Sequence, residues 1–138
     1  MRVFICVFEN FSVAIPMDCI SSLSFLTKET DEDTAVKNES EYTYISLFCL
    51  FDLPPQQTGY KIILKDHMSY KKIVLLSTPV EDEIEIPNDK IYPIPRTLKN
   101  TRFSHFFSGI RFLEDSKPVF ILNSKQLNKY IQKEMRLI

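Results

Sequence analysis

Glycine is scarce in this sequence. Only two glycines, Gly59 and Gly109, occur among 138 residues, and neither lies in a GxGxxG, a GxxxxGK or a GxSxG pattern. These patterns need glycine because the backbone must approach a phosphate closely or turn sharply at a nucleophile. The sequence therefore lacks both the phosphate-binding loops of nucleotide enzymes and the nucleophile elbow of hydrolases.

Cysteine and histidine are also few. The three cysteines, Cys6, Cys19 and Cys49, have no CxxC spacing and stand among apolar neighbours, which is typical of buried thiols in a reducing compartment and not of a zinc site. The two histidines, His67 and His105, lie in polar segments. A catalytic role for either would need a carboxylate or a cysteine beside it in space, so we interpret both as surface residues. The sequence predicts no enzyme, no cofactor and no metal ion.

An excess of charge of one sign is missing too. The chain carries 17 basic and 18 acidic residues, a net charge of -1 at pH 7. Such a balance gives no strong field toward nucleic acid or an anionic membrane surface. The apolar run from Val3 to Phe8 is broken by Glu9 and Asn10, which makes it too short for a secretory signal or a membrane span. We therefore expect a cytoplasmic protein without membrane insertion and without a nucleic-acid partner.

The chain does contain many short runs that look like strands. With 44% hydrophobic and 25% charged residues, it has the composition of one globular domain. Runs rich in β-branched and aromatic residues, separated by polar turns, predict β-strands. The predicted strands cover residues 2–8, 12–15, 19–26, 42–53, 60–64, 72–76, 80–86, 106–113 and 119–122. The first two form a hairpin, and the third is either a strand throughout or a short helical turn followed by a strand.

Polar segments and a helix complete the pattern. Residues 27–41 are interpreted as a solvated loop, in which the three consecutive acids at 31–33 lack the alternate spacing of a calcium loop. Asn123 with Gln126 resembles a capping box, so a short C-terminal helix is predicted to begin there. Many short strands and no βαβ alternation predict an all-β fold. Two small barrels that share a core, with a division near residue 60, fit the length better than one large sandwich.

The pattern also assigns some side chains to the inside or the outside. Leu23 is among the residues that the strand at 19–26 can bury, and Tyr92 is expected to be pinned beneath the proline-rich connection at 87–95. Acidic residues alternate along the strand at 80–86, which predicts one charged face in water.

Four lysines suggest one alternative function. They are interleaved with two tyrosines, and the set is Tyr60, Lys61, Lys65, Tyr70, Lys71 and Lys72. Small barrels use basic surfaces with aromatic rings to hold single-stranded nucleic acid. This alternative predicts one contiguous basic face and a strongly salt-dependent affinity for oligonucleotides.

Several segments, taken in their order along the chain, resemble one known family. Residues 77–95, which end in Ile-Tyr-Pro-Ile-Pro, are similar to the second-half signature of CheW-like domains, a strand followed by a polar pair, an isoleucine and Pro-x-Pro. Residues 107–110 resemble the family's Ser/Thr-Gly-hydrophobic step, and residues 119–123 its closing strand and helix start. Upstream, residues 8–16 resemble the opening hairpin, and either residues 45–50 or residues 51–53 resemble the central strand.

This resemblance implies both a fold and a function. The fold would be two five-stranded SH3-like β-barrel subdomains, without catalysis. The function would be that of an adaptor in chemotaxis signal transduction, which joins a CheA-type histidine kinase to methyl-accepting chemoreceptors. Ile20 falls where the family has a hydrophobic residue on its receptor-facing side, and Ser22 at a position that is often acidic. We expect Ile20, Ser22 and Ile62 at protein interfaces, with apolar strand residues as the energetic anchors.

The sequence also departs from the family. The family's Asn-Leu-Arg-Gly element before the central strand is replaced by residues 37–42. Cys49 or Asp52 stands at the usual aspartate, and Ser77 and Thr78 replace a common Val-Asp pair. These differences leave open a second alternative, a CheW-like scaffold recruited to another signalling pathway.

Overall fold

The chain divides into two compact units. The computed structural model describes residues 1–25, 36–38, 42–51, 53, 59–65, 72–94, 106–112 and 117–129. Unit 1 comprises Met1–Asp18 and Glu81–Ile138, and unit 2 comprises Cys19–Val80. The chain therefore passes between units after Asp18 and again after Val80, and residue 60 lies inside unit 2. The organisation of the whole chain as a single domain stays a prediction.

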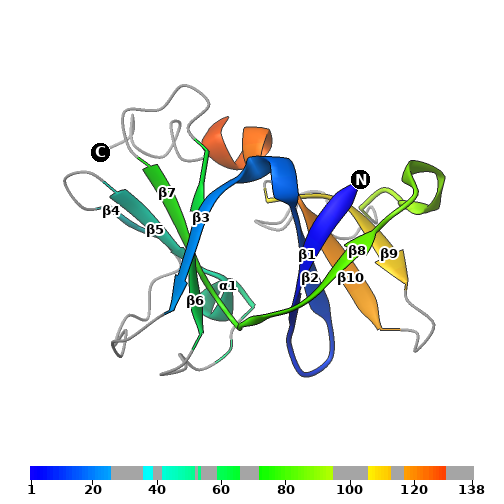
Figure 1. The fold of residues 1–138 in the computed structure, drawn as a ribbon, viewed down its shortest axis with the longest axis horizontal. Helices are drawn as coiled ribbons and strands as arrows, with labels where there is room; N and C mark the ends of the chain where they lie inside the picture. The colour runs from blue at the N-terminus through cyan, green and yellow to red at the C-terminus, as the bar shows by residue number, and fades with distance from the viewer. Residues whose placement is uncertain are drawn as a thin grey trace. The chain divides into compact units, whose positions relative to one another are not determined.

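Unit 1 contains one five-stranded sheet with the strand order β8-β1-β2-β10-β9 (Figure 1). Its elements are β1 (Arg2–Val7), β2 (Ser12–Pro16), β8 (Val80–Glu85), the 3-10 helix η2 (Asn88–Lys90), β9 (Phe107–Phe112) and β10 (Pro118–Leu122). The strands β1 and β2 are antiparallel, so the predicted opening hairpin is confirmed. Strand β10 runs parallel to β2 and antiparallel to β9.

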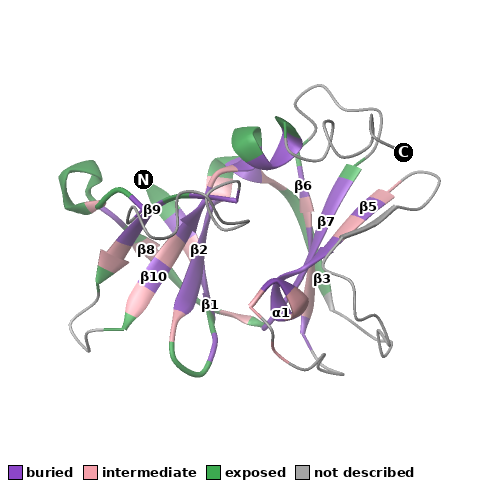
Figure 2. Ribbon diagram, turned by 180° about the vertical axis from the view of Figure 1, so that it is seen from behind, coloured by how far each residue is buried: buried purple, intermediate pink, exposed green. Residues whose placement is uncertain are grey.

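The core of unit 1 is aliphatic. Its members come from alternate positions of β1 and β10, which share one face of the sheet, and from β2 and the residue after β8. The cluster consists of Val3, Ile5, Ala14, Ile86, Val119 and Ile121. Strand β2, at the centre of the sheet, is buried along its whole length (Figure 2). Each of the larger side chains contributes about 1.5–3 kcal/mol when it is removed from water.

A helix follows β10 in unit 1. Residues 124–129 are helical, and the Asn123 side-chain oxygen accepts hydrogen bonds from the backbone N–H groups of Lys125 and Gln126, both at 3.1 Å. Leu127 is fully buried and fixes the first turn, where its N–H donates to the Asn123 carbonyl at 3.0 Å. The predicted helix start at Asn123 is therefore confirmed. Within the described residues, no helix is long and apolar enough to cross a membrane.

Unit 2 contains the second five-stranded sheet, with the order β3-β6-β7-β5-β4 (Figure 1). Its elements are β3 (Ile20–Phe25), β4 (Val36–Asn38), β5 (Tyr42–Ser46), the helix α1 (Leu47–Leu50), β6 (Tyr60–Leu64) and β7 (Lys72–Ser77). Strands β5 and β7 are parallel, whereas the other neighbours are antiparallel. A 3-10 helix, η1 (Met17–Cys19), precedes β3, as one of the two sequence alternatives predicted.

Two predictions for unit 2 are wrong. The predicted continuous strand at 42–53 ends at Ser46, where α1 begins. The Ser46 hydroxyl accepts a hydrogen bond from the Cys49 N–H at 3.2 Å, and this cap favours a helical turn over further strand. An unbroken apolar run fits a buried helix as well as a buried strand, so periodicity could not separate them. The predicted loop at 27–41 contains β4, which pairs with β5 at the sheet edge.

The described strands form open sheets. Each strand order has an edge strand at both ends, β8 and β9 in unit 1 and β3 and β4 in unit 2. In unit 1 a single β-bridge between Tyr92 and Ile110 adds the segment after η2 to the edge at β9. The all-β architecture with two five-stranded sheets is thus confirmed, while the SH3-like barrels and their shared core stay predictions.

Candidate functional site

Histidine, cysteine and acidic side chains are the groups in this chain that could bind a metal ion or act in catalysis. No set of three or more His, Cys, Asp or Glu side chains within the described ranges could hold a metal ion. The two histidines and the acidic residues 31–33 lie outside the described residues. Cys6 and Cys19 are buried, so the prediction of buried thiols is confirmed for them, while Cys49 in α1 is half-buried.

The predicted interface residues lie on two neighbouring strands of unit 2. Ile20 and Ser22 belong to β3, and Ile62 belongs to β6. In the antiparallel register Ser22 lies opposite Ile63 and Leu23 opposite Ile62, with a register shift between Ile20 and Ser22. The structure therefore brings the three predicted residues together on one strand pair, at the edge of the sheet.

Burial separates these residues. Ile20 is half-buried and Ser22 is exposed, which leaves both accessible to a partner. Ile62 is 0% exposed, so its expected place at a surface is corrected: it is a core residue of unit 2. Leu23, which the sequence placed inside, is 39% exposed. Ile62 and Ile63 follow one another in an apolar strand, so the sequence pattern alone does not indicate which side chain faces inward. We call the accessible set Ile20, Ser22 and Leu23 the β3 edge.

The strand register also tests the basic face of the nucleic-acid alternative. Lys61 lies opposite Leu76, which is four residues along β7 from Lys72. At about 3.3 Å per residue, this separates the two positions by roughly 13 Å along the strand. Lys65 is exposed after β6, and residues 66–71 lie outside the described part of the chain. The register does not bring Lys61 beside Lys72, as a contiguous basic face would need.

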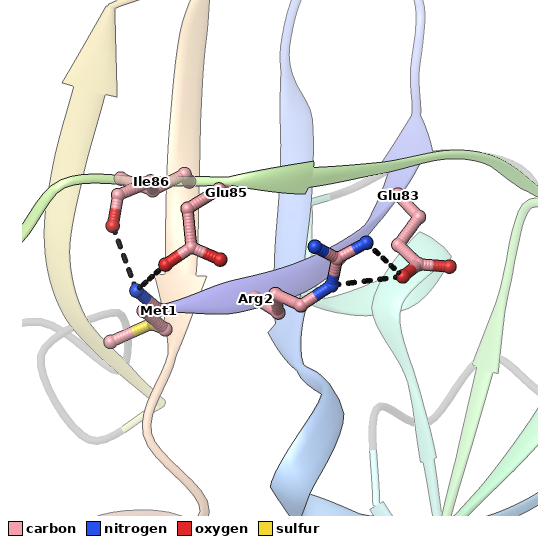
Figure 3. Close-up of polar contacts among 5 residues, drawn as sticks. All are labelled: Met1, Arg2, Glu83, Glu85 and Ile86. Carbon is pink, nitrogen blue, oxygen red and sulfur yellow. Dashed lines mark hydrogen bonds and ion pairs between the residues drawn. The ribbon is translucent and has the colours of Figure 1, made fainter.

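Unit 1 carries paired charges along β8 (Figure 3). Arg2 Nε and Nη2 donate to Glu83 Oε1 at 3.0 and 2.7 Å, and the Met1 amine donates to Glu85 Oε1 at 2.7 Å and to the Ile86 carbonyl at 3.0 Å. The hydrogen bond to Glu83, together with its negative charge, raises the pKa of Arg2. The acidic residues of β8 are exposed, so the predicted charged face is confirmed. These exposed pairs connect the edge strand β8 with the start of β1.

An exposed aromatic pair lies on the other edge of the same sheet. Tyr92 is 58% exposed and Phe112 is 56% exposed, so the expectation that Tyr92 is pinned inside is wrong. Ile91 takes the inward position and packs against the aliphatic core, because neighbouring residues of an extended segment point to opposite sides. Together with Lys90 and Arg111, the two rings line an open groove of about 340 Å³. We call this site the basic-aromatic groove. Its sequence signal is the succession of Ile91 and Tyr92 in an extended segment, where an inward Ile91 implies an outward Tyr92.

Comparison with known proteins adds to this description. No family model and no curated protein matches the chain. Among solved structures, the chain is similar to the scaffolding protein TtCheW from Thermoanaerobacter tengcongensis, with a TM-score of 0.63 and 17% sequence identity. The match covers 88% of this chain and 83% of that chain. At this identity the likeness concerns the fold, and the chain has the fold of a CheW-like domain.

Proposed function

We propose that the chain is a non-enzymatic adaptor that acts in the cytoplasm in chemotaxis signal transduction. It links methyl-accepting chemoreceptors to a CheA-type histidine kinase through protein–protein contacts. The observation that carries this proposal is the CheW-like fold, which spans 88% of the chain and is shared with a scaffolding protein. Since one fold can serve many functions, the interaction surface needs a separate argument.

The sequence resemblance and the structure support the proposal together. The segment that resembles the family signature forms β8, η2 and the extended residues after it. The Ser-Gly-hydrophobic step lies in β9, and the closing strand is β10. These strands belong to one sheet of unit 1, so the segments that carry the resemblance are parts of one structural unit and not isolated motifs.

We place the main partner contact at the β3 edge. Strand β3 is an edge strand, and an edge strand offers backbone N–H and C=O groups to a second chain. Ile20 supplies a half-buried apolar side chain there, while Ser22 and Leu23 are exposed. Interfaces draw most of their energy from a few apolar or aromatic side chains, and the polar rim tunes specificity. Ile20 and Leu23 fit the first role and Ser22 the second.

Titration calorimetry with purified partners tests the proposal. The wild-type chain should bind a CheA-type kinase and the cytoplasmic fragment of a chemoreceptor. Ile20→Asp places a charge at the proposed apolar anchor, so we expect affinity for at least one partner to fall roughly 30-fold or more, the equivalent of a hot-spot residue. Ser22→Arg should also weaken binding, because it adds a bulky charge to the exposed side of the same strand.

Two controls make the result interpretable. Ser108→Arg introduces the same change at an exposed serine on β9 of unit 1 and should bind as the wild type does. Circular dichroism must show that each variant is folded; if Ile20→Asp unfolds the protein, Ile20 is a core residue and Ser22→Arg decides the location. Normal binding by both β3 variants would move the interface elsewhere. Binding of the wild type to neither partner would reject the chemotaxis function and favour a CheW-like scaffold of another pathway.

A further inference from the structure

We propose that the basic-aromatic groove of unit 1 is a docking site for an acidic peptide segment of a partner protein, in which a carboxylate lies next to an aromatic side chain. The groove is lined by Lys90, Tyr92, Arg111 and Phe112. It belongs to unit 1, whereas the β3 edge belongs to unit 2. The inference therefore does not depend on the kinase and receptor contacts proposed above.

The groove is built by a fixed backbone arrangement. After η2 the chain is extended, and Tyr92 pairs with Ile110 of β9 through two backbone hydrogen bonds, N–H to O in each direction, both at 2.8 Å. Lys90 precedes this bridge by two residues, and Arg111 and Phe112 follow it directly on β9. The four lining residues are therefore held by adjacent, hydrogen-bonded segments of backbone, and the site is formed before a partner arrives.

The two aromatic rings are the apolar part of the site. Tyr92 and Phe112 are more than half exposed, a costly state for rings of this size, since each would gain free energy by leaving water. Aromatic side chains and arginine are enriched at the centres of protein interfaces, and rings prefer offset or edge-to-face contact with another ring. The groove is open and has a volume of about 340 Å³, near the lower end of the range for ligand pockets. It fits a side chain or two of a peptide better than an enclosed cofactor.

Charge complementarity selects the occupant. No ion pair with either Lys90 or Arg111 is recorded among the described residues, and neighbouring Asp89 is exposed and does not line the groove. Lys90 and Arg111 thus contribute two positively charged side chains to the same groove as the two rings. A carboxylate suits Arg111, whose planar guanidinium can donate two parallel hydrogen bonds, and Lys90 adds a second point charge. An aromatic residue beside that carboxylate would reach Tyr92 or Phe112.

A titration followed by nuclear magnetic resonance tests the proposal. The ¹⁵N-labelled full chain is titrated with acetyl-Asp-Phe-Glu-Phe-amide, and its amide analogue acetyl-Asn-Phe-Gln-Phe-amide serves as the neutral control. We expect the acidic peptide to shift the backbone signals of residues 90–92 and 110–112. The affinity of the neutral peptide should be lower than that of the acidic peptide by a factor of roughly ten or more, which corresponds to the loss of one charge-assisted hydrogen bond.

Matched variants separate the groove from general electrostatic attraction. Lys90→Gln with Arg111→Gln should reduce affinity for the acidic peptide roughly tenfold or more. The control is the double variant Lys125→Gln with Lys129→Gln, which removes the same amount of charge from the exposed side of the helix at 124–129. It should leave peptide binding unchanged. The proposal is overturned by equal binding of the two peptides, by shifts centred outside the groove, by an equal loss in the control pair, or by no shift at millimolar peptide.

Discussion

Gly109→Ala is the substitution for which the structure makes the sharpest prediction. A Cβ atom at this position would lie 2.6 Å from Ile91 Cγ2 and 2.7 Å from the Tyr92 carbonyl oxygen. The isoleucine could rotate, but the carbonyl oxygen is fixed because it accepts the hydrogen bond from the Ile110 N–H. The methyl group must therefore push the Tyr92 segment away from β9.

The expected loss can be estimated from its parts. Overpacking a well-packed site costs about 1–3 kcal/mol, and the two bridge hydrogen bonds contribute about 0.5–1.5 kcal/mol each. Replacing glycine by alanine recovers about 0.4–1 kcal/mol, because it restricts the unfolded chain. We expect Gly109→Ala to lower the free energy of unfolding by roughly 1–5 kcal/mol.

Two measurements check this prediction. The chain contains no tryptophan, so urea unfolding is best followed by circular dichroism. Native-state hydrogen exchange gives the local result: the amides of Tyr92 and Ile110 should lose protection. In an Ile91→Ala background, where Cγ2 is absent, most of the loss should remain, since the carbonyl oxygen is still in the way. A loss below about 0.5 kcal/mol with both amides protected would refute the close approach.

Substitutions at three further positions test smaller contacts. Ser46→Ala removes the acceptor for the Cys49 N–H and should cost about 1 kcal/mol in urea unfolding; no loss would mean that the cap does not determine where β5 ends. Asn123→Ala should cost a similar amount, whereas Asn123→Asp should retain stability because its carboxylate accepts the same N–H groups near the positive end of the helix. Glu83→Gln breaks an exposed pair with Arg2, so no change in the unfolding midpoint should be resolved. Because folding raises the pKa of Arg2, the contribution of its charge to stability is complete below its ordinary pKa and is lost only in strong alkali. The difference in the free energy of unfolding between Glu83→Gln and wild type should therefore stay constant from about pH 6 to about pH 9.

The strands could largely be predicted from the sequence. The prediction for β6 matches the structure residue for residue, and those for β1, β7 and β10 differ only at their ends. These segments combine β-branched residues with polar turns, which is a local signal. The run at 42–53 gave no such signal, because continuous apolarity fits a strand and a buried helical turn equally well. The hydrogen bond from the Cys49 N–H to the Ser46 hydroxyl marks the point where the strand stops and the helix begins.

The candidate sites were predicted less well, for a physical reason. Which of Ile62 and Ile63 faces the core depends on the pairing of β6 with β3 and β7, and a shift by one residue exchanges the two faces. The basic-aromatic groove depends on a bridge between Tyr92 and Ile110, which lie in separate segments of the chain. Such long-range pairings are not written in local composition. The sequence marked β3 as a candidate interface strand because its residues could be compared with a known family.

Reconstitution of the three-component assembly tests the adaptor function most directly. Membranes that carry a methyl-accepting chemoreceptor are mixed with a CheA-type kinase, with or without the purified chain, and the kinase that sediments with the membranes is measured. An adaptor predicts that kinase is recovered with the receptor in proportion to the added chain, and that Ser22→Arg reduces this recovery while Ser108→Arg does not. Recovery of the same amount of kinase with and without the chain would contradict a linking role.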